Sequence, residues 1–202
     1  MREILRLAGV LTLICVVCTA LLAAVHERTR GPIERAAAAR RVATARDVLP
    51  PDAPRLRPVV AGGATNFAAF DERGKLLATA VEGRSGNGYG GEIVIMAGIS
   101  ADGRLIDFKV LEDTETPGLG KKIAAPAFAR RVQGRAIDAD WRVRQDGGEI
   151  EAVTAATISS RAVLEAIRDA IARHRAVLAA LAAGGEEPPA ALPPAAVSTE
   201  EP

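Results

Sequence analysis

The chain has 202 residues, 25% of them charged, and a formal net charge of +1 at pH 7. This length suffices for one ordinary domain with additional segments. The near-neutral charge and an aromatic content of 3% argue against a nucleic-acid-binding protein, because such proteins need a basic surface or a stacking platform. The only histidines are His26 and His174, and the only cysteines are Cys15 and Cys18. Their spacing predicts neither a metal site nor a Cys–His nucleophile.

Residues 7–25 form an uncharged apolar run near the N-terminus. As a helix rising about 1.5 Å per residue, this run would span roughly 28 Å, close to the thickness of a bilayer core. It has no clear signal-peptidase site and no lipoprotein signal. We therefore expect residues 1–30 to form a permanent anchor in membrane lipid, with Cys15 and Cys18 as apolar packing residues rather than a redox pair.

Arginines flank both ends of this apolar run. Arg2 and Arg6 precede it, and the arginines that follow it are Arg28, Arg30, Arg35, Arg40 and Arg41. A simple count of positive charges would place the following domain in the cytoplasm, but long domains are translocated largely regardless of such charges. The charge pattern alone leaves the orientation open.

Residues 31–58 are expected to form a helical stalk and a Pro-rich connector. Residues 33–48 are rich in Ala, Arg and Glu and follow Gly31-Pro32, which predicts a helix. The prolines from Pro50 onward predict that the helix ends there and that the chain after it is extended.

Short runs of strand-forming residues predict a sheet within a domain at residues 59–183. The predicted strands are residues 66–70, 76–81, 92–99, 105–111, 141–144 and 149–153. Turn signals at Asp102-Gly103 and at Gly147-Gly148 predict that the last four strands form two hairpins.

A long helix is predicted to close this domain. Apolar residues follow helical spacing from Arg161 to about Ala183, and His174 is interpreted as a surface or boundary residue of this helix. Residues 184–202 are Pro-rich and acidic, which predicts a disordered tail. The predicted fold class is α+β: an N-terminal transmembrane helix and helical stalk, then a mostly antiparallel sheet with packed helices.

Three segments contain more glycine or hydroxyl groups than ordinary turns require. They are Gly88-Tyr-Gly-Gly-Glu-Ile93, Glu115-Thr-Pro-Gly-Leu-Gly120 and the stretch EAVTAATISS at 151–160. Each glycine segment alone is compatible with a tight loop, although two glycines around an apolar residue also let the backbone approach a flat ligand closely.

The third segment precedes the predicted C-terminal helix. Its hydroxyl groups belong to Thr154, Thr157, Ser159 and Ser160. A helix N-terminus has unpaired N–H groups and positive partial charge, so these hydroxyls either cap the helix or hold a phosphate there.

The chain resembles the FMN-binding domain of RnfG, from the Rnf ion-translocating electron-transport complex, in four stretches: GYGGEI, AGISADGRLIDFKVLED, ETPGLG and EIEAVTAATISSRAV. The resemblance extends from the N-terminal anchor, through ARDVLP at 45–50, to the C-terminal helix. The same domain occurs in NqrC, from the sodium-translocating NADH:quinone reductase. NqrC is usually longer, so the short chain favours RnfG.

This resemblance implies a membrane-anchored flavoprotein that relays electrons through FMN, within an Rnf-type ion-translocating oxidoreductase complex. It implies a bacterial inner-membrane location with the domain in the periplasm, the other proteins of the complex as partners, and a flavin transferase for maturation. The chemistry would belong to the cofactor, so no catalytic side chain is expected. A flavin-free scaffold protein of such a complex and a free-standing FMN-binding sensor are the alternatives.

In that family FMN is joined through its phosphate to the last threonine of a motif resembling Asp-x-x-Ser/Thr-Gly-Ala-Thr. The resemblance therefore implies a phosphoester at Thr157. Thr154 is the rival acceptor, and Ser159 and Ser160 would bind the phosphate or cap the helix.

The resemblance also implies that Thr116, Gly118 and Leu119 lie against the flavin, in a loop that Glu115 orders. Glu151 stands where the family motif has Asp, and Ala155 stands where it has Gly. Alanine at this position is harmless if its φ is negative and costly if its φ is positive.

Overall fold

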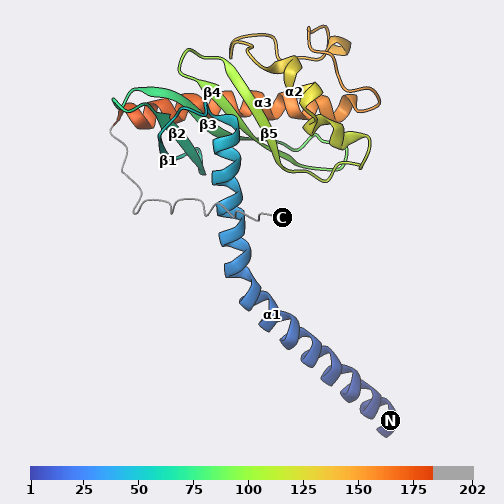
Figure 1. Cartoon of the computed structure of the whole chain (residues 1–202). Coiled ribbons are helices and arrows are strands. Elements are labelled where there is room, and N and C mark those ends of the chain that lie inside the picture. Colours follow the sequence, from blue (N-terminus) through green and yellow to red (C-terminus); the bar gives the residue numbers. More distant parts are fainter. Residues whose placement is uncertain (184–202) are drawn as a thin grey trace, which may run out of the picture. The chain divides into compact units, whose positions relative to one another are not determined.

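The structure is a computed structural model, and it describes residues 1–183 (Figure 1). These residues divide into two compact units, Met1–Arg40 and a second unit that begins at Arg41. The helices are α1 (Arg2–Val48), η1 (Gly120–Ala124), α2 (Pro126–Val132), η2 (Arg144–Asp146) and α3 (Thr157–Ala182). The strands are β1 (Arg55–Ala61), β2 (Ala64–Phe70), β3 (Leu76–Ser85), β4 (Ile93–Ser100) and β5 (Leu105–Glu112). The tail predicted at 184–202 lies outside the described residues.

Helix α1 contains both the predicted anchor and the predicted stalk. Pro32 lacks the N–H of one helical hydrogen bond, but the helix continues through it. No break therefore separates the two segments. Within the first unit, an 18-residue window of this helix has a mean hydropathy of 2.6 and none of it is buried in the structure. Among the described residues, α1 is thus the one helix that is long and apolar enough to cross a membrane.

The second unit contains a five-stranded antiparallel sheet in the order β1-β2-β3-β4-β5 (Figure 1). The hairpin predicted around Asp102-Gly103 is confirmed: β4 pairs with β5, and Gly103 turns the chain with a φ of +76°. Strand β1 was not predicted, because Pro58 lies within it. A proline is tolerated there because β1 is an edge strand, where one missing N–H need not break the ladder.

The second predicted hairpin, residues 141–144 with 149–153, is wrong. These residues form the short helix η2 and a single parallel bridge between Val143 and Ile150. The N–H of Arg144 donates to the Ile150 carbonyl (2.8 Å) and the N–H of Ile150 donates to the Arg142 carbonyl (3.2 Å), and no antiparallel ladder forms between these residues. Val143 and Ile150 are instead both buried in the core.

Helix α3 covers one face of the sheet, and the last turns of α1 pack on the other. Strand β4 shows this directly, because Ile95 and Ala97 belong to the core under α3 whereas Met96 packs with Ala45 and Val48 of α1. The folded unit therefore begins before residue 59, the boundary expected from the sequence.

Two glycines let these helices approach the sheet closely. A Cβ on Gly83 would lie 2.1 Å from the carbonyl oxygen of Ala166 in α3. A Cβ on Gly98 would lie 1.9 Å from the carbonyl oxygen of Val48 in α1. Any side chain at either position would force the helix away from the sheet.

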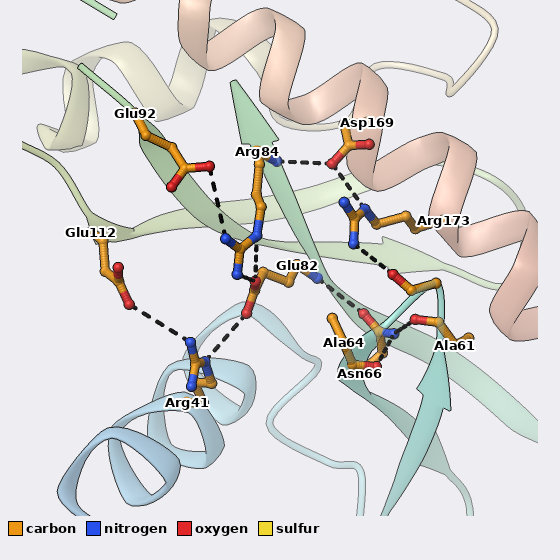
Figure 2. Close-up of polar contacts among 11 residues, drawn as sticks. Arg41, Ala61, Ala64, Asn66, Glu82, Arg84, Glu92, Glu112, Asp169 and Arg173 are labelled. Carbon is orange, nitrogen blue, oxygen red and sulfur yellow. Dashed lines mark hydrogen bonds and ion pairs between the residues drawn. The ribbon is translucent and has the colours of Figure 1, made fainter. Parts of the chain in front are cut away.

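A charged cluster joins the end of α1 to β3 (Figure 2). Glu82 is only 2% exposed, and its carboxylate accepts hydrogen bonds from Arg41 (3.3 Å) and from Arg84. Arg41 also pairs with Glu112 at 3.7 Å, and Arg84 with Glu92 at 3.8 Å. The buried carboxylate is thus compensated by two arginines from different elements.

Candidate functional site

A cavity of about 530 Å³ lies where the three unusual sequence segments meet. Its lining residues are Tyr89, Glu115, Thr116, Leu119, Gly120, Ala155, Ala156, Thr157, Ile158 and Ser159. The first belongs to the β3–β4 loop, the next four to the segment after β5, and the last five to the two residues before α3 and its first turn. Segments far apart in the sequence therefore build one site.

Glu115 connects the three segments beneath the cavity. Its side chain is buried, its Oε2 accepts a hydrogen bond from the Ser159 hydroxyl (2.7 Å), and its Oε1 accepts one from the Gly90 N–H (3.2 Å). Gly88 and Gly120 leave room for this carboxylate, since a Cβ on either would lie within 2.7 Å of one of its oxygens. The carboxylate holds the cavity floor together.

The ETPGLG segment forms a tight loop beside the cavity. The carbonyl oxygen of Thr116 accepts hydrogen bonds from the N–H groups of Leu119 (3.2 Å) and Lys121 (3.3 Å). Gly118 makes this turn possible with a φ of +78°. Thr116 and Leu119 line the cavity, whereas Gly118 is not among the lining residues and shapes the loop.

Helix α3 begins at Thr157, earlier than the predicted start at Arg161. Ala156 is its N-cap, and no side chain makes a capping hydrogen bond in this part of the structure, so the capping interpretation of the hydroxyls is not supported. The first-turn N–H groups of α3 have no acceptor within the helix. Thr157, half-buried and lining the cavity, lies beside these donors.

The neighbouring hydroxyl groups differ in their surroundings. Ser160 is buried, accepts a hydrogen bond from the Val153 N–H (2.9 Å) and donates one to the Ala156 carbonyl (2.9 Å), so it is fully engaged in shaping the chain before α3. Thr154 is exposed and is not among the cavity-lining residues. Of the three hydroxyl residues other than Thr157, only Ser159 lines the cavity, and its hydroxyl donates to Glu115.

Ala155 has a φ of +62°, and it is the only non-glycine residue with positive φ among residues 1–183. This is the left-handed region, where a Cβ crowds the neighbouring carbonyl oxygen. The backbone at Ala155 therefore has the positive φ at which alanine is costly.

Arg131 of α2 braces the chain just before this strained residue. Its Nη1 donates hydrogen bonds to the carbonyl oxygens of Glu151 (2.7 Å) and Ala152 (2.9 Å). The Glu151 side chain is exposed and does not line the cavity. Only its backbone oxygen is used here, so the change from Asp to Glu leaves this contact unaffected.

Two residues were misjudged or missed from the sequence. His174 is buried rather than at the surface, and its Nδ1 lies 2.8 Å from the Thr79 hydroxyl oxygen. Burial, with a smaller contribution from Arg175, lowers the pKa of His174. Tyr89 lines the cavity although no role was assigned to it; its position between glycines was the available signal.

Two family models match parts of this chain. The FMN-binding domain family matches residues 88–172, and the RnfG N-terminal region matches residues 1–48. A crystal structure of Shewanella oneidensis NqrC aligns with a TM-score of 0.49 and 25% identity, over 59% of this chain and 61% of that chain.

Curated relatives are named as the G subunit of the ion-translocating oxidoreductase complex. The Shewanella baltica protein is 38% identical over 48% of this chain and 49% of its own length, so the chain spans about half of that relative. The Cereibacter sphaeroides protein is 35% identical over 84% of this chain and 85% of its own length. The Pseudomonas aeruginosa protein is 30% identical over 92% of this chain and 97% of its own length. The chain belongs to this RnfG family of ion-translocating oxidoreductase complexes.

Proposed function

We propose that this chain is a membrane-anchored flavoprotein that relays electrons through FMN, joined by a phosphoester to Thr157, within an ion-translocating oxidoreductase complex. The observation that carries the proposal is the meeting of Thr157, the ETPGLG loop and the glycine-rich loop in one cavity at the uncapped start of α3. Membership of the RnfG family and the match to the FMN-binding domain support it.

The residues of the cavity fit FMN. Its volume of about 530 Å³ lies within the range of about 300–1,000 Å³ that is usual for cofactor sites. Apolar side chains of Leu119 and Ile158 suit a flat aromatic ring, and the helix N-terminus suits a phosphate. Gly88 and Gly120 leave room for the Glu115 carboxylate, which holds the segments that line the cavity.

Thr157 is the best-placed phosphate acceptor of the four hydroxyl residues. Its neighbours in the first turn of α3 present backbone N–H donors, and the helix dipole favours negative charge at this end. A phosphoester there replaces the threonine O–H by an O–P bond, with loss of one water between the hydroxyl and the phosphate. Thr154 lies outside the lining, and the Ser159 and Ser160 hydroxyls already serve buried hydrogen bonds.

When bound, FMN supplies the electron-transfer chemistry, and this chain positions it. Thr116 and Leu119 would bound the ring from the ETPGLG loop, with Gly118 setting the loop's turn. Glu115 would keep that loop in register with the phosphate end through Ser159.

The anchor in α1 and the family membership support a place in a bacterial inner membrane, with the other proteins of the complex and a flavin transferase as partners. We propose that the domain faces the periplasm. Fusing a reporter that is active only in the periplasm to the C-terminus tests this orientation, and an inactive reporter on a stably expressed protein would refute it.

The flavin attachment is tested by intact mass and peptide mapping of protein made in its own host or beside a flavin transferase. The expected result is a mass increase of one FMN less one water, mapped to Thr157 and lost in Thr157→Ala. Thr154→Ala is the matched control and should retain the full increase. An unmodified wild-type chain would favour the flavin-free scaffold, and co-purification with other proteins of the complex separates both from a free-standing sensor.

A further inference from the structure

Tyr89 is exceptional among the aromatic side chains of this protein. The chain has four phenylalanines, one tryptophan and one tyrosine. Phe67, Phe108, Phe128 and Trp141 are buried and Phe70 is half-buried. Tyr89 is 71% exposed, and it lines the cavity. The one aromatic ring that is left largely in water thus lies at the site that the proposed function assigns to a flat aromatic cofactor.

The loop that carries Tyr89 is held firmly from the β5 side. The Gly90 N–H donates to Glu115 Oε1 (3.2 Å), and the Thr114 hydroxyl donates to the Gly90 carbonyl (2.7 Å). Gly88 and Gly90 cannot accept a side chain, because a Cβ on Gly90 would lie 2.1 Å from the Thr114 carbonyl oxygen and one on Gly88 would lie 2.3 Å from that of Gly91. The backbone on both sides of Tyr89 is therefore packed closely against neighbouring residues.

Helix α3 holds the other end of the same loop. Glu165 Oε2 accepts hydrogen bonds from the Ser85 hydroxyl (2.8 Å) and from Asn87 Nδ2 (2.7 Å). One turn further along α3, Asp169 accepts a hydrogen bond from the Arg84 N–H (2.9 Å), as Figure 2 shows. Tyr89 is thus presented by a loop fixed to the helix whose first residue is Thr157.

We infer that Tyr89 covers the isoalloxazine ring of the bound FMN, packing its own ring against the flavin and limiting the access of solvent. The inference rests on the proposed function. Aromatic rings pack on one another in offset or edge-to-face arrangements, and a tyrosine can bury its apolar body while its hydroxyl stays in water. Because the loop is already fixed, little backbone conformational entropy is lost when the ring binds.

The test uses the flavinylated full chain and compares wild type with Tyr89→Leu and Tyr89→Phe. A tyrosine packed against a flavin quenches its fluorescence, whereas phenylalanine covers the ring without quenching it. Tyr89→Leu should raise the flavin fluorescence several-fold and also raise the iodide quenching constant. Tyr89→Phe should raise the fluorescence while iodide access stays at the wild-type value.

Leu178→Ala is the matched control, since Leu178 is an exposed apolar residue of α3 outside the cavity. It should leave both readings unchanged. Equal fluorescence and equal iodide access in wild type and Tyr89→Leu, with FMN mapped to Thr157 in both, would overturn the role of Tyr89 and leave the proposed function standing. Wild-type chain without FMN would overturn both.

Discussion

The Ser159 hydroxyl donates a hydrogen bond to Glu115 across 2.7 Å, and both side chains are almost completely buried. The two residues are 44 positions apart, so this bond ties the first turn of α3 to the loop after β5. Because the same carboxylate also accepts the Gly90 N–H, Glu115 joins all three segments that line the cavity.

Ser159→Ala is expected to lower the free energy of unfolding by about 1–3 kcal/mol, because it leaves a buried carboxylate oxygen without its donor. Glu115→Gln should cost less, since the amide oxygen can still accept the Gly90 N–H while the amide nitrogen donates to the Ser159 hydroxyl oxygen. Chemical denaturation of the full chain in detergent measures this, with the buried Trp141 as the fluorescent probe.

The exposed Thr154 offers the control for this pair, because Thr154→Ala should change the free energy of unfolding by less than about 0.5 kcal/mol. Equal stability of Ser159→Ala and Thr154→Ala would mean that the buried hydrogen bond contributes nothing to the fold.

Ala155→Gly is expected to stabilise the protein, unlike most substitutions of alanine by glycine. The positive φ of Ala155 costs a residue with a Cβ about 1–2 kcal/mol, and glycine removes that strain at a smaller entropic cost. The melting temperature should rise by a few degrees. Glycine at this position also matches the family motif, so the fraction of chains that carry FMN should not fall.

Ala172→Gly is the control: it is the same substitution, but it is expected to lower the melting temperature instead of raising it. Ala172 is exposed within α3, where glycine is less favourable than alanine by about 1 kcal/mol. Thermal unfolding of the two variants should therefore move the midpoint in opposite directions. A loss of stability in both would contradict the strain assigned to Ala155.

The sequence predicted the parts of this fold that depend on local signals. Asp102-Gly103 indicated the β4–β5 hairpin because its turn chemistry is local, and the apolar spacing of α3 indicated the long helix. Gly147-Gly148 carries a similar local turn signal, but the second predicted hairpin does not form there. The chain instead forms η2, and the flanking Val143 and Ile150 are buried in the core. Local signals cannot reveal such a tertiary effect.

The three segments that line the cavity lie far apart in the sequence. They were recognisable by their glycines and hydroxyls, but which of them meet depends on contacts between distant residues. The bond from Ser159 to Glu115 and the burial of His174 follow from the packing of α3 on the sheet, which no periodicity predicts. The φ of Ala155 likewise requires the backbone to be known.

Glu82→Gln should destabilise the second unit by about 1–3 kcal/mol, because it removes the buried negative charge that Arg41 and Arg84 share. This cost is smaller than that of breaking a fully buried pair, since both arginines are partly exposed and water can solvate them. Glu92→Gln is the matched control: its carboxylate is 54% exposed and 3.8 Å from Arg84, so its loss should cost less than about 0.5 kcal/mol. Denaturation curves that rank the two variants in the reverse order would contradict the cluster's role.

His174 should make the free energy of unfolding decrease as the pH falls below the ordinary histidine pKa of about 6.5. Burial lowers its pKa in the folded protein, whereas the unfolded chain has the ordinary value of about 6.5. As the pH falls below that value, the unfolded chain binds a proton that the folded protein resists, so the free energy of unfolding decreases. The stabilisation from the neutral histidine is therefore fully present above pH 6.5 and is lost as the pH falls toward the lowered pKa.

His174→Gln tests this dependence, because glutamine can keep a hydrogen bond to the Thr79 hydroxyl but does not titrate. Denaturation midpoints of wild type and variant at several pH values should differ in slope: the wild type loses stability toward pH 5 more steeply than the variant. Parallel curves would show that protonation of His174 is not coupled to unfolding. A buried, neutral imidazole on the sheet-facing side of α3 would then act only through its packing and its contact with Thr79.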